Sequence, residues 1–482
     1  MEKGTWSKQS VMPLYRWTTL STTLMLGIRT TISVILSQTG QQSEAVTDDE
    51  PQQLRKPKST RQQLLANDLP VRTTFVSKTD EHSEHGHELK LVGTHFVREV
   101  VHRIPGRLFV EKIYEKTYKC STCELEDGCS HIYRGNAPKA LIAHSIATPS
   151  LIASILHQKC ILGTPLYRQL KDWQRAGVLL SETTISNWVI KCAELVKPVY
   201  DLMRSHLMSQ GFLQGDETPY QVLQEPGKSA QSKSYIWVAR SITRCETPVV
   251  MYAYANTRSG KFAQNLYSGF PGVLQCDGYA GYNLLGDSIT RVGCWAHVRR
   301  KFFDDFKNTK KMTLGLKLLN QMFELERNWA GLDSASRLEK RQVVLKPLIE
   351  HFWEWCDHVE TLPKDRLGKA LAYAQGQRVA LNRVLEFGEI DLSNNASERN
   401  MKSYVIGRKN WLFSTSPKGA EANAIWMTVV ETAKANGIDP RNYITQLLEI
   451  VSQLPTFAKT ESLEACLPWN LKTNSSNVES IV

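Results

Sequence analysis

The chain of 482 residues lacks an uninterrupted run of about 20 apolar residues, the length that crosses a membrane. The nearest stretch, residues 17–36, contains Arg29 and several Thr and Ser residues, so we interpret it as a divergent or misassigned start, with a poorly formed signal peptide as the alternative. The ten cysteines are scattered, and Cys120 and Cys123 form the single Cys-x-x-Cys pair. This pattern excludes the disulfide framework of a small secreted protein and favours a reducing, cytoplasmic setting.

The length is too great for one ordinary hydrophobic core and predicts several modules. Lys and Arg exceed Asp and Glu by 11, which favours an anionic partner. Residues 37–80 are rich in Gln, Ser, Thr, Asp and Glu with little periodicity, and this composition predicts a linker.

Two pairs of candidate zinc ligands flank a predicted β-hairpin. His82 and His85 precede it, and Cys120 and Cys123 follow it, a spacing that suits tetrahedral Zn²⁺. Substitute ligands are available at Cys129 and His131. A metal-free hairpin with surface histidines explains the same residues equally well.

Residues 150–200 predict helices with a turn at Gly177. Ser181 is placed to cap the helix in which Ile185 and Trp188 recur at helical spacing. Helix, turn and capped helix is the sequence form of a helix-turn-helix that binds DNA. Its first helix would carry the cations Arg168, Lys171 and Arg175. A pair of helices that only pack together is the alternative.

From Gly211 the pattern changes to strands rich in β-branched and aromatic residues. We expect strands at 212–216, 233–242, 248–256 and 272–277, with a helix at 259–270 before the last strand. If the first and last of these strands lie side by side, Asp216 and Asp277 at their ends come together.

Residues 305–385 are helical in composition, and we infer a helical insertion within the 121 residues (398 − 277) that separate Asp277 from Glu398. Downstream, Asn436-Gly437 predicts a helix C-cap. Asp439-Pro440 predicts the start of a last helix.

Asp216, Asp277 and Glu398 form an oxygen-only ligand set, which suits Mg²⁺ or Mn²⁺. Two such ions could clamp the attacking and leaving oxygens of a phosphoryl transfer. Each residue also has a plain explanation, because Asp commonly starts turns and Glu398 can pair with Lys402 on a solvated helix.

Cations surround these carboxylates in the sequence. They are candidate phosphate contacts, and Trp411 could stack on an unpaired base or lie in the core. The candidate DNA-binding residues are Arg299, Arg300, Lys301, Arg399, Lys402, Arg408, Lys409 and Trp411.

Several long motifs occur in one order: GDETPYQVL, LQCDGYAGYN, GCWAHVRRKFFD, SNNASERNMKSYVIGRKNWLF and ETAKANGIDPRNYITQLL. In these motifs the chain resembles the DDE transposases of the insertion sequence 66 family, from about Arg55 to about Leu448. The resemblance implies an α+β multidomain protein with a ribonuclease-H-like core, in which Asp216, Asp277 and Glu398 are the catalytic residues and hold Mg²⁺ or Mn²⁺. The family's zinc module has Cys-x-x-Cys at both ends, whereas histidines replace the first pair here.

The resemblance further implies DNA as partner, both the terminal inverted repeats of the element and the target. It also implies a homo-oligomer on that DNA, accessory proteins of the same element and no membrane. The expected activity is DNA cleavage and strand transfer. The alternatives are a catalytically degenerate DNA-binding protein or repressor, and a metal-dependent nuclease that cuts without joining.

The expected modules follow in chain order: 1–80 divergent N-terminus and linker, 81–131 zinc-finger-like module, 140–205 helical DNA-binding region, 206–304 first part of the core, 305–388 helical insertion, 389–416 glutamate segment, 417–456 C-terminal helices and 457–482 disordered tail.

Overall fold

The computed structural model describes residues 71–471 except 79–81, 84, 105–106, 128, 131 and 456. The predictions for residues 17–36 and for most of the linker lie outside the described residues. Among the helices of the described part, none is both long enough and apolar enough to span a membrane.

The first sheet is built on the hairpin that the sequence predicted. β2 (Lys90–Ile104) and β3 (Arg107–Lys119) pair antiparallel, and short β4 (Ile132–Arg134) joins the edge of β3. β1 (Val71–Val76) pairs parallel with β3, so the linker prediction is wrong for these six residues. A helix, α2 (Ser121–Asp127), follows β3.

Four helical segments then lead to the central sheet: α3 (Pro149–Leu156), the π-helical turn η2 (His157–Ile161), α4 (Leu166–Arg175) and α5 (Glu182–Met208). The chain turns between α4 and α5 at Gly177, whose φ is +84°. The Ser181 hydroxyl accepts a hydrogen bond from the Thr184 N–H (3.1 Å), which confirms the predicted N-cap.

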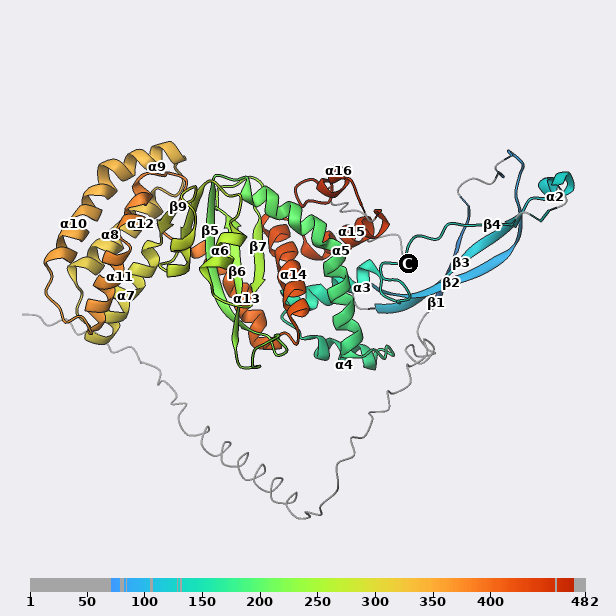
Figure 1. Cartoon of the computed structure of the whole chain (residues 1–482), viewed down its shortest axis with the longest axis horizontal. Coiled ribbons are helices and arrows are strands. Elements are labelled where there is room, and N and C mark those ends of the chain that lie inside the picture. Colours follow the sequence, from blue (N-terminus) through green and yellow to red (C-terminus); the bar gives the residue numbers. More distant parts are fainter. Residues whose placement is uncertain are drawn as a thin grey trace, which may run out of the picture. The chain divides into compact units, whose positions relative to one another are not determined.

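The central sheet has the strand order β7-β6-β5-β8-β9 (Figure 1). β5 pairs antiparallel with β6 and parallel with β8, while β7 and β9 lie at the two edges. The strands are β5 (Phe212–Gln221), β6 (Lys233–Ser241), β7 (Val250–Ala255), β8 (Val273–Cys276) and β9 (Thr290–Gly293). Helix α6 (Gly260–Leu266) precedes β8, and the 3₁₀ turn η3 (Ala280–Leu284) follows it.

Helix α14 (Pro417–Ala435) packs on β7 (Figure 1). Two threonines make this contact specific, because the N–H groups of Val250 and Tyr252 donate to the Thr432 and Thr428 hydroxyls (3.1 and 2.8 Å). The helix ends at Asn436-Gly437, as its sequence predicted, with Gly437 at a φ of +71°.

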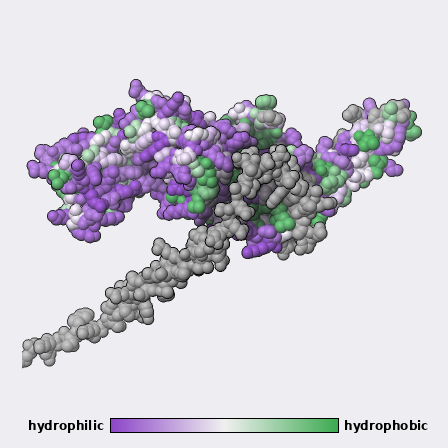
Figure 2. All heavy atoms as spheres, turned by 60° about the horizontal axis from the view of Figure 1, so that its bottom comes forward, coloured by the Kyte–Doolittle hydropathy of each residue, from purple (hydrophilic) through white to green (hydrophobic). Residues whose placement is uncertain are grey.

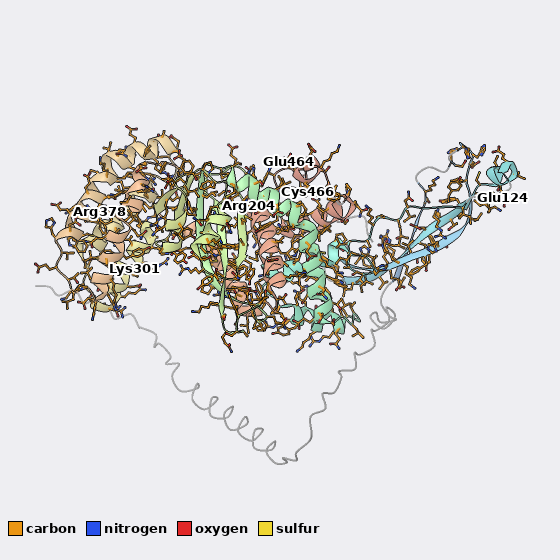
Figure 3. All side chains as sticks on the ribbon, viewed as in Figure 1. Glu124, Arg204, Lys301, Arg378, Glu464 and Cys466 are labelled. Carbon is orange, nitrogen blue, oxygen red and sulfur yellow. The ribbon has the colours of Figure 1, made fainter. Side chains whose placement is uncertain are left out.

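Helix α15 (Pro440–Gln453) begins at an Asp439 cap, again as predicted, since Asp439 accepts from the Asn442 N–H (2.8 Å). The composition predicted a disordered tail from residue 457, and this is wrong for residues 457–471. They contain α16 (Thr460–Glu464), which contacts α5, and Cys466 and Leu467 are buried in the main core. Figure 3 labels Glu464 and Cys466 of this segment and Arg204 of α5, the helix that α16 contacts.

The predicted helical insertion has a hydrophobic core of its own, centred on Trp295, Phe302, Phe352 and Trp353. It begins earlier than expected, because α7 starts at Trp295 and shares this core. Its outer surface is largely hydrophilic (Figure 2). The helical segments are α7 (Trp295–Thr309), α8 (Leu314–Asn328), α9 (Ser334–Lys340), η4 (Arg341–Leu345), α10 (Lys346–His358), α11 (Arg366–Gly376), α12 (Arg378–Asn382) and η5 (Arg383–Leu385).

Candidate active site

The pairing of β5 with β8 brings Asp216 and Asp277 to the same edge of the sheet. The last paired residues of the two strands are Gln214 and Gln275. Asp216 and Asp277 each follow two residues later, so they occupy the same register position beyond the paired segment. The sequence placed Asp216 at the end of its strand, whereas β5 continues to Gln221 through pairing with β6. It is the pairing with β8 that ends before Asp216.

Two buried glutamines join these strands to the segment that leads into α13 (Asn395–Trp411). The Gln214 amide donates to the side-chain oxygen of Gln275 (2.8 Å), and the Gln275 amide donates to the Asp391 carbonyl (2.6 Å). The chain is held further along by Asn394, whose amide donates to the Gly215 carbonyl (3.3 Å). These bonds fix the start of α13 beside the end of the β5–β8 pair.

Glu398 lies on the first turn of α13 and makes an ion pair across to α7. Arg300 donates to both of its carboxylate oxygens (2.9 Å each), and His297 Nε2 lies 3.4 Å from one of them. Burial lowers the pKa of His297, and the negative charge of Glu398 opposes this effect. In this structure the Glu398 carboxylate is therefore paired with the Arg300 guanidinium.

The pKa of Asp216 reflects its burial and the charges of nearby carboxylates. Burial and the charge of Glu217 raise the pKa of Asp216 to about 7, with further contributions from the charges of Asp277 and Glu398. The Glu217 backbone N–H, which donates to Asp216 (2.9 Å), acts in the opposite direction. Burial together with the neighbouring carboxylates therefore disfavours the charged form of Asp216.

Glu217 lies on the other face of β5, because successive side chains of a strand alternate. Its side chain is 1% exposed and accepts hydrogen bonds from Arg258 Nε (2.9 Å) and the Tyr282 hydroxyl (2.7 Å). A side chain at Gly215 would lie on the same face, and its Cβ atom would be only 2.3 Å from the Tyr267 hydroxyl. Glu217 is therefore bound to Arg258 and Tyr282 on one face of β5, whereas Asp216 lies on the other face.

The helical insertion holds the irregular segment before α13 through two buried arginines. Arg341 forms a double hydrogen bond with Glu326 (2.6 and 2.8 Å) and donates to the carbonyls of Phe387 and Ile390 (2.6 and 2.7 Å). Arg337 donates to the Gly388 carbonyl (2.6 Å). The insertion therefore positions the chain that carries Glu398 into the site.

The predicted cations of the site differ in their surroundings. Arg399, Lys402 and Lys409 are exposed on α13, whereas Arg408 bonds to the Pro219 carbonyl and to the Thr218 hydroxyl (3.4 Å) of β5. On α7 the Arg299 side chain donates to Asn320 (2.7 Å), and exposed Lys301 lies over the Tyr373 ring. Arg408 and Arg299 are thus committed to the protein, and the exposed cations are available to a ligand.

Within the described residues, no three His, Cys, Asp or Glu side chains are grouped closely enough to hold a metal ion. At the carboxylate site, Glu398 is paired with Arg300 (2.9 Å). In the candidate zinc module, Cys120 is buried beside Leu89 and Tyr118, and the Cys123 side chain and His131 lie outside what the structure describes. The zinc ligands therefore stay a prediction.

Sequence reasoning missed the buried residues that build the site. The signal for two of them was present, because Leu-Gln-x-Asp occurs in both FLQGD and VLQCD and places a polar Gln within each apolar strand. His297 and Glu217 lay inside the quoted motifs without an assigned role. Arg341 carried no local signal, since its partners are distant in the sequence.

Comparison with known proteins assigns the chain to a family. Residues 144–422 match the family described as "Transposase IS66 family", and residues 428–469 match the "IS66 C-terminal element". This chain belongs to the IS66 transposase family. The first match spans the β5–β8 pair, the helical insertion and Glu398.

Among its relatives, the IS66-family chain is similar to three uncharacterized proteins of Sinorhizobium fredii (strain NBRC 101917 / NGR234). It is 30% identical to y4jD over 395 residues, which cover 78% of this chain and 75% of that protein. It is 28% identical to y4hP over 404 residues (79% and 71%) and 30% identical to y4qI over 365 residues (72% and 67%). Membership of a transposase family implies that the chain binds DNA.

Proposed function

We propose that this IS66-family chain cleaves the DNA ends of its element and transfers them to target DNA by metal-dependent phosphoryl transfer. The observation that carries the proposal is the shared register of Asp216 and Asp277 at the end of the β5–β8 pair, with Glu398 contributing to the same electrostatic site. The strand order β7-β6-β5-β8-β9, with α13 against β5, supports a ribonuclease-H-like core for this chemistry.

The donor set suits Mg²⁺ or Mn²⁺, because carboxylate oxygens are the ligands these ions prefer. The raised pKa of Asp216 supports the same conclusion, since a bound cation would offset the excess negative charge. Asp216, Asp277 and Glu398 would hold the ions, with Glu398 released from Arg300. Two bound ions would supply an activated hydroxyl nucleophile and a neutralised leaving oxygen.

The side chains of the protein would orient the DNA. Exposed Arg399, Lys402 and Lys409 follow Glu398 along α13, where they can bind phosphates next to the scissile bond. Arg300, once released by Glu398, can bind a phosphate in place of the carboxylate. Recognition of the element ends would lie upstream, where Arg168, Lys171 and Arg175 are exposed on α4.

The test is a cleavage and strand-transfer assay with the terminal repeats of the element, Mg²⁺ and the full chain. Asp216→Asn, Asp277→Asn and Glu398→Gln should each remove both activities and leave DNA binding largely intact. Asp287→Asn is the matched control, because this aspartate is exposed in the loop before β9. A carboxylate variant that retains full strand transfer would refute the assignment.

The alternative functions give different outcomes in this assay. A catalytically degenerate DNA-binding protein or repressor would bind the DNA ends and would not cut them at any Mg²⁺ or Mn²⁺ concentration. A nuclease would cut the ends, lose that activity in Asp216→Asn, and never join them to target DNA.

A further inference from the structure

A cavity lies at the far end of α13, away from the carboxylates. Its volume is about 730 Å³, and residues of η2, α4, α5, α13 and α14 line it. Between Glu398 and Trp411, which lines the cavity, α13 advances 13 residues, or about 20 Å at 1.5 Å per residue. The cavity is therefore separate from the site proposed for chemistry.

Lys159 brings a positive charge into this cavity from the π-helical turn η2. Its ammonium donates to the Asn423 side-chain oxygen (2.5 Å) and lies 4.4 Å from the centre of the Trp411 ring. The Asn423 amide is oriented by its own bond to the Tyr404 hydroxyl (2.7 Å). Lys159 is thus held by a neutral amide and an aromatic face.

Among the residues that the structure describes, no carboxylate forms an ion pair with Lys159. Burial lowers the pKa of Lys159, and among the described residues the opposing influence comes from the Cys160 thiol. Glu182 also lines the cavity, but it sits on the first turn of α5, where the helix dipole stabilises it. Lys159 is half-buried, and a partly desolvated cation without a carboxylate partner is unfavourable, so an anion that enters the cavity would form a favourable ion pair with it.

The mouth of the cavity offers aromatic rings to the same ligand. Phe413 and Tyr167 are 38% and 41% exposed, large fractions for aromatic rings that line a cavity. Phe413 is presented by a γ-turn at Leu412, whose φ of 65° and ψ of −55° belong to the rare, strained form of this turn. Amides of Asn187, Asn410 and Gln224 line the cavity as well.

A row of cations connects this cavity with the carboxylate site. Arg399, Lys402 and Lys409 are exposed and lie at positions i, i+3 and i+10 of α13, on one side of the helix. A DNA backbone that follows this row from Glu398 reaches the cavity mouth within a few nucleotides.

We propose that this cavity binds one unpaired nucleotide of a DNA strand, with its phosphate on Lys159 and its base beside the rings of Tyr167 and Phe413. The inference rests on the proposed action on DNA, and it adds a holding site remote from the carboxylates. Aromatic rings stack on any of the four bases, so the site would bind an unpaired nucleotide whatever its base.

The test measures binding of the full chain to a labelled oligothymidylate of about 12 nucleotides, by fluorescence anisotropy over a range of salt concentrations. Lys159→Met should weaken binding about tenfold and flatten the salt dependence by about 0.7, the value for one phosphate on a single strand. Phe413→Ala should weaken binding by about fivefold or more without changing the salt dependence.

The controls separate this site from general charge and from folding. Lys159→Arg keeps the cation and should retain the salt dependence, while Lys191→Met removes an exposed lysine of α5 and should leave binding unchanged. Lys159→Met should melt no lower than the parent chain, because it removes a half-buried charge that has no carboxylate partner. A melting temperature well below the parent's would contradict the view that the charge is uncompensated.

The proposed chemistry can fail independently. Asp216→Asn should bind the oligothymidylate like the parent chain, whether or not the parent cuts DNA. If the parent never cuts but Lys159→Met weakens binding as expected, the holding site stands and the proposed activity falls. If Lys159→Met and Phe413→Ala both bind like Lys191→Met, the holding site is refuted.

Discussion

Replacing Asp216 by Asn should stabilise the metal-free protein while abolishing its activity. Burial, with the charge of Glu217, raises the pKa of Asp216 from 3.8 to about 7, so the folded state holds a proton that the unfolded state releases. The folded state therefore binds more protons between about pH 4 and pH 7, and its stability falls as the pH rises through that window. Above pH 7 the full destabilisation is present.

The pKa change corresponds to about 4 kcal/mol as an upper limit, and partial exposure of Asp216 reduces it to about 1–3 kcal/mol. Asn has nearly the same shape and no charge, so Asp216→Asn should gain this amount at pH 8. The gain should be small at pH 4, where the folded state is protonated and the unfolded state is only partly ionised.

The assay is denaturant unfolding in EDTA at pH 4, 6 and 8, compared with the exposed control Asp287→Asn. Added Mg²⁺ should stabilise the parent chain at pH 8 and have little effect on Asp216→Asn, because the variant loses a ligand. A variant less stable than the parent at pH 8, or a gain equal at pH 4 and pH 8, would show that unscreened negative charge does not destabilise this site.

Arg341→Ala leaves a buried carboxylate unpaired and should reduce the free energy of unfolding by about 3–5 kcal/mol, measured by denaturant titration. Lys409→Ala should flatten the salt dependence of duplex binding by about 0.9, whereas Arg408→Ala should chiefly lower the melting temperature, because that guanidinium bonds to β5. Arg300→Met frees Glu398 from its ion pair and should tighten Mg²⁺ binding by up to about fivefold in calorimetry without DNA. If the module at 81–131 binds zinc, the purified chain should carry about one zinc ion, and chelation should unfold that module alone.

Local sequence signals predicted the elements that depend on nearby residues. The Ser181 cap, the Asn436-Gly437 end of α14 and the strands β6 and β7 follow from caps, turns and β-branched runs. The pairing of β5 with β8 was expected from the order of three strands, a helix and a fourth strand, which is the pattern of a ribonuclease-H-like core.

The extent of β5 could not be predicted, because Pro219 argues against a strand. It is tolerated because β8 pairs with β5 only over Phe212–Gln214, so the missing N–H faces an edge that β8 leaves open. β9 was missed as well, since four residues containing Thr, Arg and Gly give no clear strand pattern.

Contacts between distant segments were beyond sequence reasoning. The Arg300–Glu398 pair joins two helices across 98 residues of sequence, and it occupies the carboxylate that we propose as the third metal ligand. Each residue alone is an ordinary charge on a helix, so the pairing has no local signature.

The arginines of the insertion have a consequence for the order in which the three carboxylates come together during synthesis. Asp216 and Asp277 can take their places once β8 has formed, but Glu398 is positioned only after Arg337 and Arg341 have captured the segment around Gly388. During synthesis the ribosome must release the whole insertion before the third carboxylate reaches the others. Long-range pairing of this kind forms late in folding. A nascent chain that ends before Glu398 therefore carries two of the proposed catalytic carboxylates without the third, and the proposed site can form only after the insertion has been synthesised.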